Sequence, residues 1–160
     1  MRTAICPGSY DPITLGHLNI IRRATHLFDK VIICVGVNAG KNPLFTLEER
    51  MDQIRRVTAR FPNVEVESWD GLQVDFASRY ENPVLVRGLR TLTDFEYEFQ
   101  MEMFNKRLNK DVETIFLAAA EKYTYLSSSA VRELALYGAD ISDYVPCEIV
   151  AEVAERGRAK

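Results

Sequence analysis

The sequence has few cysteines and histidines for its 160 residues. Its three cysteines are odd in number and lack a C-x-x-C pair, which disfavours a disulfide framework. Only two histidines are present, and no His/Cys cluster suggests a zinc site. Cys6 and Cys34 lie in apolar, strand-like runs where a small buried thiol is expected, and Cys147 has no assigned role. We therefore expect a reduced, cytoplasmic protein.

Strong charge imbalance and long apolar runs are also missing. Lys and Arg number 20 and Asp and Glu 23, for a formal net charge of −3. This balance disfavours nucleic acid as a partner, because duplex binding needs clustered positive charge. No apolar run reaches transmembrane length and no signal-peptide core is visible, so we expect no membrane partner. A small anionic ligand is compatible with the composition, since a few local cations suffice for it.

Several common catalytic motifs are absent. The sequence contains no G-x-x-x-x-G-K-[ST] phosphate loop, no G-x-G-x-x-G dinucleotide turn and no G-x-S-x-G elbow. Covalent catalysis by an activated nucleophile is therefore poorly supported.

Short β-branched runs alternate with longer helical patterns along the chain. The expected strands are residues 3–6, 31–37, 64–67, 84–86 and 114–118. The run from Val31 to Val35 has no polar alternation, which favours a strand covered on both faces. Thr46 and Glu49 predict a capping box that begins the second helix. This alternation predicts a single α/β domain over residues 1–160 with a parallel sheet, whose ligands bind beyond the carboxyl ends of the strands.

Residues 94–104 carry conflicting signals. Polar and apolar residues alternate strictly, which favours a strand. We nevertheless expect a helix, because Thr93 and Glu96 have capping-box spacing. On a helix the apolar residues form two stripes, Phe95/Phe99/Met103 and Tyr97/Met101/Phe104/Leu108. One stripe can face the sheet and the other another subunit; the alternative is that a loop or the C-terminal helix covers the second stripe.

Residues 7–17 form the first candidate ligand-binding segment. A short apolar run leads into a turn rich in Gly and Pro and then into a helix that begins near His17. Unpaired N–H groups at a helix start, together with the hydroxyl of Ser9, would bind a phosphate. The alternative is an ordinary strand-to-helix turn with an exposed histidine.

Two further segments have similar chemistry. Arg87-Gly88-Leu89-Arg90 follows the fourth predicted strand and indicates a compact cationic turn, unless its arginines are merely solvated. Ser127-Ser128-Ser129 precedes a helical pattern and indicates a second anion site, although simple capping needs only one serine. Lys41, in the loop after the second strand, could also reach a phosphate, but isolated loop lysines are usually solvated.

These motifs together resemble a known family. With Thr14-Leu15-Gly16-His17, Arg87-Gly88-Leu89-Arg90 and Ser127-Ser128-Ser129-x-x-Arg132 in place, the chain is similar to the bacterial phosphopantetheine adenylyltransferases, members of the T-x-G-H nucleotidyltransferase superfamily. The similarity covers nearly the whole chain. It implies a Rossmann-like, five-stranded parallel sheet flanked by helices and a homohexamer. It also implies the penultimate step of coenzyme A biosynthesis, in which Mg-ATP adenylylates 4′-phosphopantetheine by direct in-line attack, giving dephospho-coenzyme A and pyrophosphate.

The resemblance also implies the site residues. The expected catalytic groups are His17, Lys41, Arg87 and Arg90. The expected ATP-binding residues are Ser9, Tyr10, His17, Gly88, Leu89, Arg90, Glu98, Tyr123, Thr124, Tyr125, Leu126, Ser127, Ser128 and Ser129. The expected substrate-binding residues are Ser9, Lys41, Leu72, Gln73 and Arg87. Mg²⁺ is expected to enter on the ATP phosphates, with no protein ligand assigned.

Three alternatives to this activity are open at this point. One is adenylyl or cytidylyl transfer to another small phosphate. A second is a nucleotide-binding regulator without turnover, although such a protein would be expected to have lost a catalytic cation. The third is a structural assembly module built on the aromatic helix.

Overall fold

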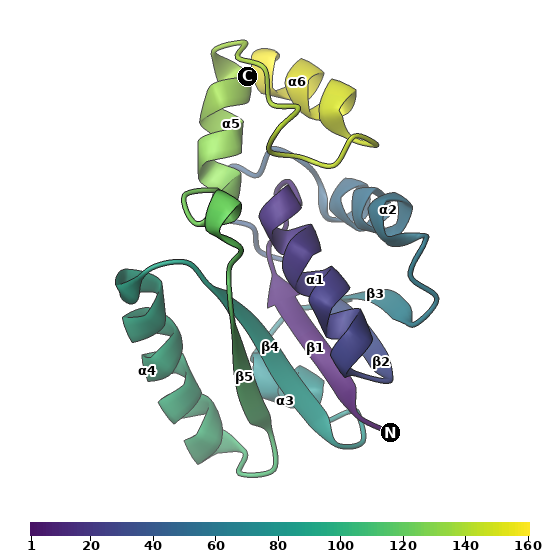
Figure 1. Ribbon diagram of the computed structural model, residues 1–160, viewed down its shortest axis with the longest axis vertical. Helices are drawn as coiled ribbons and strands as arrows, with labels where there is room; N and C mark the ends of the chain where they lie inside the picture. Colours follow the sequence, from purple (N-terminus) through teal and green to yellow (C-terminus); the bar gives the residue numbers. More distant parts are fainter.

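The β-branched runs form one parallel sheet in the computed structural model, which describes residues 1–160 (Figure 1). Its strands are β1 (Thr3–Gly8), β2 (Lys30–Gly36), β3 (Val64–Trp69), β4 (Pro83–Leu89) and β5 (Glu113–Ala118). The five strands follow the order β3-β2-β1-β4-β5, and every neighbouring pair is parallel. The predicted Rossmann-like α/β fold with a five-stranded parallel sheet is confirmed.

One predicted strand end is wrong. Arg87, Gly88 and Leu89 belong to β4 rather than to a turn, because they continue its pairing with Phe116, Leu117 and Ala118 of β5. Only Arg90 lies beyond the strand. Arg87 is therefore held by the rigid sheet, and its position is better defined than a turn would allow.

Helices cover both faces of the sheet (Figure 1). They are α1 (Leu15–Leu27), α2 (Leu47–Thr58), α3 (Gln73–Ala77), α4 (Leu92–Leu108), α5 (Ser128–Leu136) and α6 (Val150–Arg158), with a 3₁₀ turn η1 (Glu121–Tyr123). The capping box of Thr46 and Glu49 begins α2 as predicted. The cap of α4 was predicted wrongly, because Thr91 and not Thr93 accepts the N–H of Asp94. Both threonines precede an acidic residue at the same spacing, so the local pattern could not choose between them.

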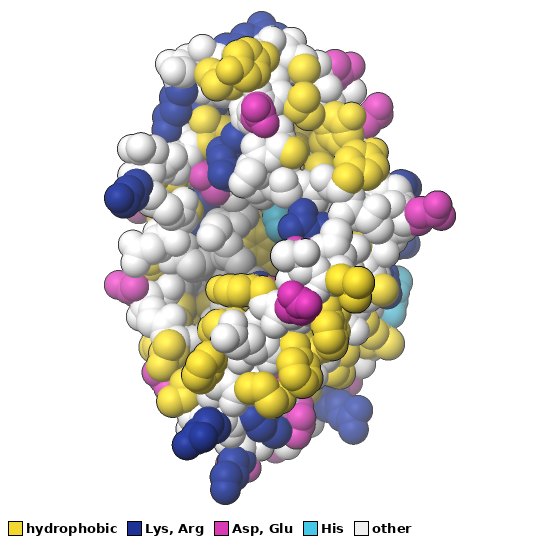
Figure 2. Space-filling view, turned by 90° about the vertical axis from the view of Figure 1, so that its left-hand side faces the viewer, with side chains coloured by type: hydrophobic (Ala, Val, Ile, Leu, Met, Phe, Trp, Pro, Cys, Tyr) yellow, Lys and Arg dark blue, Asp and Glu magenta, His cyan; other side chains and the backbone are white.

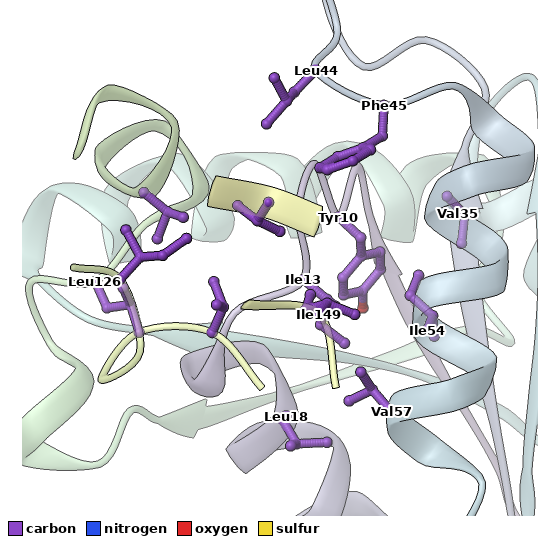
Figure 3. Packing of buried hydrophobic residues seen from close by; sticks show 14 of the residues in the cluster. Tyr10, Ile13, Leu18, Val35, Leu44, Phe45, Ile54, Val57, Leu126 and Ile149 are labelled. Atoms are coloured by element: carbon purple, nitrogen blue, oxygen red, sulfur yellow. The ribbon is translucent and has the colours of Figure 1, made fainter. Parts of the chain in front are cut away.

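The main core lies on the face of the sheet covered by α1, α2, α5 and α6. It contains 17 buried side chains, and Figure 3 shows Tyr10 and Ile13 of the turn after β1 pointing among Ile54, Val57 and Ile149. Burying one large aliphatic side chain contributes about 1.5–3 kcal/mol. The turn that carries the T-x-G-H motif is thus fixed by the core. On the opposite face a smaller cluster packs α3 against β1, β2 and β4.

Helix α4 confirms the prediction of a helix over residues 94–104. Most side chains of both apolar stripes are exposed, with Phe99 at 48% and Phe104 at 55%, although Phe95 packs against Phe116 of β5 and Met101 is partly buried. The alternative that a loop or the C-terminal helix covers the second stripe is wrong, since α6 packs with α5 at the other end of the molecule (Figure 1). None of the helices combines the length and apolar composition needed to span a lipid bilayer.

Candidate active site

A pocket of about 300 Å³ opens at the carboxyl ends of β1 and β4. These neighbouring strands flank the point where the chain reverses its direction of travel across the sheet, which is where parallel α/β folds bind ligands. Figure 2 shows this hollow with a histidine side chain at its floor and basic side chains nearby. Of the predicted residues, the pocket is lined by Ser9, Tyr10, His17, Arg87, Gly88, Arg90, Glu98, Tyr123, Leu126, Ser127 and Ser128.

The T-x-G-H motif is a helix cap. Thr14 is the N-cap of α1, and its Oγ1 accepts the backbone N–H of His17 at 3.3 Å. In return, Nδ1 of His17 accepts the backbone N–H of Thr14 at 3.0 Å. A capping box normally has Glu or Gln in the position that His17 occupies. Because a backbone N–H can only donate, Nδ1 is the acceptor and the neutral ring carries its proton on Nε2.

His17 is held in this neutral form. Burial, reinforced by the charges of Arg90 and Arg87, lowers the pKa of His17 from 6.5 to about 4. The ring of Tyr10 packs edge-on against the imidazole with centroids 4.9 Å apart, and the Tyr10 hydroxyl donates to the carbonyl of Cys6 at 2.9 Å. Near neutral pH the imidazole is thus a fixed, uncharged donor.

Arg87 lines the pocket as half of an ion pair. Its Nε and Nη2 donate to the two carboxylate oxygens of Glu98 at 2.8 and 2.7 Å, and Nη1 donates to the carbonyl of Pro7 at 2.7 Å. Burial by itself lowers the pKa of Arg87, but the hydrogen bonds and charge of Glu98 outweigh it and raise the pKa. The guanidinium is therefore charged and rigidly oriented by two-point pairing.

Arg90 connects β4 to the serine-rich segment. Its Nε donates to Asp94 at 3.0 Å and its Nη1 donates to the carbonyl of Leu126 at 2.6 Å. The second contact ties residues 123–127 to the end of β4. Two predicted anion-binding segments therefore meet at one side of the pocket.

The three serines have different partners. Ser127 caps α5 by accepting the N–H of Ala130 at 3.1 Å. Ser128 donates to the carbonyl of Pro12 at 2.7 Å, and Ser129 accepts from Arg132 at 3.2 Å. Capping thus uses only one serine, while Ser128 fastens α5 to the turn that precedes α1.

Some predicted residues do not line the pocket. Lys41 is exposed in the loop after β2, and Tyr125 is 70% exposed. Gln73 instead lines a second cavity of about 60 Å³, which shares Arg87 and Glu98 with the pocket. The remaining predicted residues outside the pocket lining are Leu72, Leu89, Thr124 and Ser129. Their roles stay predictions.

Thr14, quoted in the motif, and Asp94 were given no role in the site from the sequence. Thr14 sets the tautomer of His17, and its signal is the capping-box spacing with histidine at the last position. Asp94 lines the pocket and pairs with Arg90 four residues earlier, which is an ordinary helical spacing for an ion pair.

Comparisons with known proteins identify the family to which the sequence belongs. The family model described as cytidylyltransferase-like matches residues 5–134. A curated phosphopantetheine adenylyltransferase from Caldanaerobacter subterraneus subsp. tengcongensis is 52% identical, covering 95% of this chain and 94% of the relative. The one from Clostridium botulinum strain Hall is 47% identical, covering 98% of this chain and 95% of the relative.

The fold also matches a solved structure. A Vibrio parahaemolyticus protein provisionally assigned as a nicotinate-nucleotide adenylyltransferase superposes with a TM-score of 0.73, covering 100% of this chain and 98% of that one. At 19% identity this likeness shows the shared fold alone. From the near-full-length sequence matches, the chain belongs to the cytidylyltransferase-like family and, within it, to the phosphopantetheine adenylyltransferases.

Proposed function

We propose that this protein transfers the adenylyl group of ATP to 4′-phosphopantetheine, giving dephospho-coenzyme A and pyrophosphate, the penultimate step of coenzyme A biosynthesis. The observation that carries the proposal is 52% identity to a phosphopantetheine adenylyltransferase over 95% of the chain. The pocket between β1 and β4, with a neutral histidine donor and two arginines, gives that chemistry a suitable location.

The reaction requires little acid–base chemistry from the protein. The nucleophile is a phosphate oxygen of 4′-phosphopantetheine, whose second pKa of about 6 leaves it largely dianionic near neutral pH. It attacks the α-phosphorus of ATP, forming a new P–O bond while the bond to pyrophosphate breaks. No covalent enzyme intermediate is formed. Catalysis then consists of holding two polyanions in line and stabilising the charge that develops between them.

Each polar group has a role in this scheme. His17 donates its Nε2 proton in a hydrogen bond to an α-phosphate oxygen, without transferring it. Arg90, with the backbone of residues 88–89 and 123–129, holds the ATP. Arg87, Lys41 and Ser9 act on the phosphate of the acceptor.

The pantetheine arm is assigned to the second cavity. Gln73 lines this cavity together with Arg87 and Glu98, which also line the main pocket. An acceptor whose phosphate lies beside Arg87 can therefore extend its arm past Gln73, with Leu72 next to it in the chain. The residues shared by the two cavities support the assignment.

Magnesium is assigned to the substrate. The carboxylates that line the pocket, Asp94 and Glu98, are both paired with arginines. This pairing favours a Mg²⁺ ion that enters on the ATP phosphates, where it offsets their negative charge.

The proposal includes a homohexamer in the cytoplasm. The exposed apolar side chains of the two α4 stripes support association, because clusters of large apolar side chains on a water-exposed helix are typical of interfaces. Cys6 and Cys34 are buried free thiols, which suits a reducing compartment.

Pyrophosphate release from Mg-ATP, with and without 4′-phosphopantetheine, tests the proposed function. Parallel reactions contain nicotinamide mononucleotide or glycerol phosphate as acceptor, and CTP in place of ATP. Release only with ATP and 4′-phosphopantetheine is expected. Turnover with another acceptor but not with 4′-phosphopantetheine would show that the assigned substrate is wrong. ATP binding without turnover with any acceptor would favour a nucleotide-binding regulator.

A further inference from the structure

Arg50 is a buried arginine outside the pocket lining. It lies on α2, is 1% exposed, and its partners are backbone carbonyl oxygens rather than carboxylates. Nη1 donates to Ser9 and Gly36, both at 2.8 Å, Nη2 donates to Val37 at 3.2 Å, and Nε donates to Phe45 at 3.3 Å. One guanidinium thus connects three separate chain segments.

Asp11 binds one of these segments through the segment's backbone N–H groups. It is 2% exposed, and its two carboxylate oxygens accept the backbone N–H groups of Leu44 at 2.8 Å and Phe45 at 2.9 Å. Phe45 is therefore held through its N–H by Asp11 and through its carbonyl by Arg50. We call these two residues with their backbone contacts the Asp11–Arg50 clamp.

The clamp holds both ends of the loop 38–43, which contains Lys41. Gly36 and Val37 precede this loop and Leu44 and Phe45 follow it. The loop itself is largely exposed. Its hydrogen bonds to other segments are also exposed: the Asn38 side chain donates to Asp70, and the Lys160 ammonium donates to the carbonyl of Pro43. The position of Lys41 therefore depends mainly on the fixed ends.

We propose that Arg50, together with Asp11, is a positioning residue for adenylyl transfer, which fixes the Lys41 loop relative to the turn that carries Ser9. Arg50 acts on the acceptor phosphate through Lys41 rather than by contact. This inference rests on the proposed function, because it uses the assignment of Lys41 to that phosphate.

The position requires arginine and not merely positive charge. A guanidinium has five donors in a planar fork, whereas an ammonium has three donors around one nitrogen. A buried charge is costly unless dipoles replace its water, and the carbonyls of all three segments do so here. Arg50→Lys keeps the charge, but three donors on one nitrogen cannot reproduce the four hydrogen bonds that the guanidinium donates.

Steady-state kinetics give the first test. Arg50→Lys is expected to raise KM for 4′-phosphopantetheine about tenfold, the factor that corresponds to loss of one hydrogen bond to a charged group, with kcat nearly unchanged. Arg56→Lys is the matched control, since Arg56 lies on the same helix in an exposed ion pair with Asp52 and Glu152. Its kinetic constants should equal those of the wild type.

A double-mutant cycle tests the route through Lys41. Lys41→Ala alone should raise KM for 4′-phosphopantetheine, and adding Arg50→Lys should raise it no further. If KM of the double variant instead rises by the product of the two single-variant increases, Arg50 acts independently of Lys41, and the proposal is overturned.

Native-state trypsin cleavage after Lys41 gives a readout that needs no activity. Cleavage there should be faster in Arg50→Lys than in wild type or Arg56→Lys, while cleavage elsewhere is unchanged. An unchanged rate, or a uniform increase along the chain, would overturn the positioning role. If Arg50→Lys does not fold, Asp11→Asn serves instead, because its amide can accept only one of the two N–H groups. Failure of the wild type to use 4′-phosphopantetheine would refute the proposed function and leave this cleavage test intact.

Discussion

Nδ1 of His17 accepts a hydrogen bond from the backbone N–H of Thr14, 3.0 Å away, inside the capping box that begins α1. This contact joins local structure to chemistry. The cap satisfies helix N–H groups that would otherwise lack partners, and it fixes the ring proton on Nε2. The same threonine therefore serves both helix stability and the assigned donor.

Thr14→Ala should lower both stability and activity. Loss of the cap oxygen costs about 1 kcal/mol of unfolding free energy, and a frayed first turn misplaces His17, lowering kcat about tenfold. Urea unfolding and steady-state kinetics measure the two effects. Thr46→Ala removes the corresponding cap of α2 and should cost similar stability with kcat unchanged. A folded Thr14→Ala protein with wild-type kcat would show that the cap does not position His17.

His17→Ala removes the donor assigned to the α-phosphate. We expect kcat to fall by at least about two orders of magnitude, the usual effect of removing a donor that acts on developing charge. KM for ATP and 4′-phosphopantetheine should change little, because the interaction is made mainly in the transition state. Steady-state kinetics with both substrates measure these constants. A near-normal kcat would contradict the role of His17 as a donor to the α-phosphate.

His17 should also make stability depend on pH. Its pKa is about 4 in the folded protein against 6.5 for the free side chain, so in this window the unfolded chain binds a proton that the native state does not. Stability therefore falls as pH falls through the window, with a slope of up to about 1.4 kcal/mol per pH unit from this residue. Urea unfolding of wild type and His17→Asn across the window should show a shallower slope for the variant. Parallel losses in the two proteins would contradict the assignment.

The stripes of α4 should mediate association. The wild type is expected to sediment as an oligomer at micromolar concentration, and Phe104→Glu should shift it to smaller species by placing charge in an apolar contact. Leu27→Glu, at a comparably exposed position on α1, is the control and should leave the sedimentation of the oligomer unchanged. Sedimentation of the wild type as a monomer would contradict the proposed hexamer.

The fold was predictable because its signals are local. Alternating runs and the Thr46 capping box identified strands and helices without tertiary information. The end of β4 was not predictable, since Arg87 to Leu89 remain extended only through pairing with β5. The true cap at Thr91 was ambiguous, because Thr93 has the same local spacing.

The candidate site was predictable in location but not in its internal contacts. His17, Arg87 and Arg90 meet because the carboxyl ends of neighbouring parallel strands meet. No local pattern indicates that Arg87 is paired with Glu98, or that Arg50 binds the carbonyl of Ser9. Such contacts arise only when distant segments pack.

Transfer of a labelled α-phosphate tests the central claim most directly. In a single turnover with α-labelled Mg-ATP and 4′-phosphopantetheine, the label should appear in dephospho-coenzyme A at the rate of pyrophosphate release, with none on the protein. Label bound to the protein before product forms would contradict direct transfer. Absence of label from dephospho-coenzyme A in an active protein would contradict the assigned reaction.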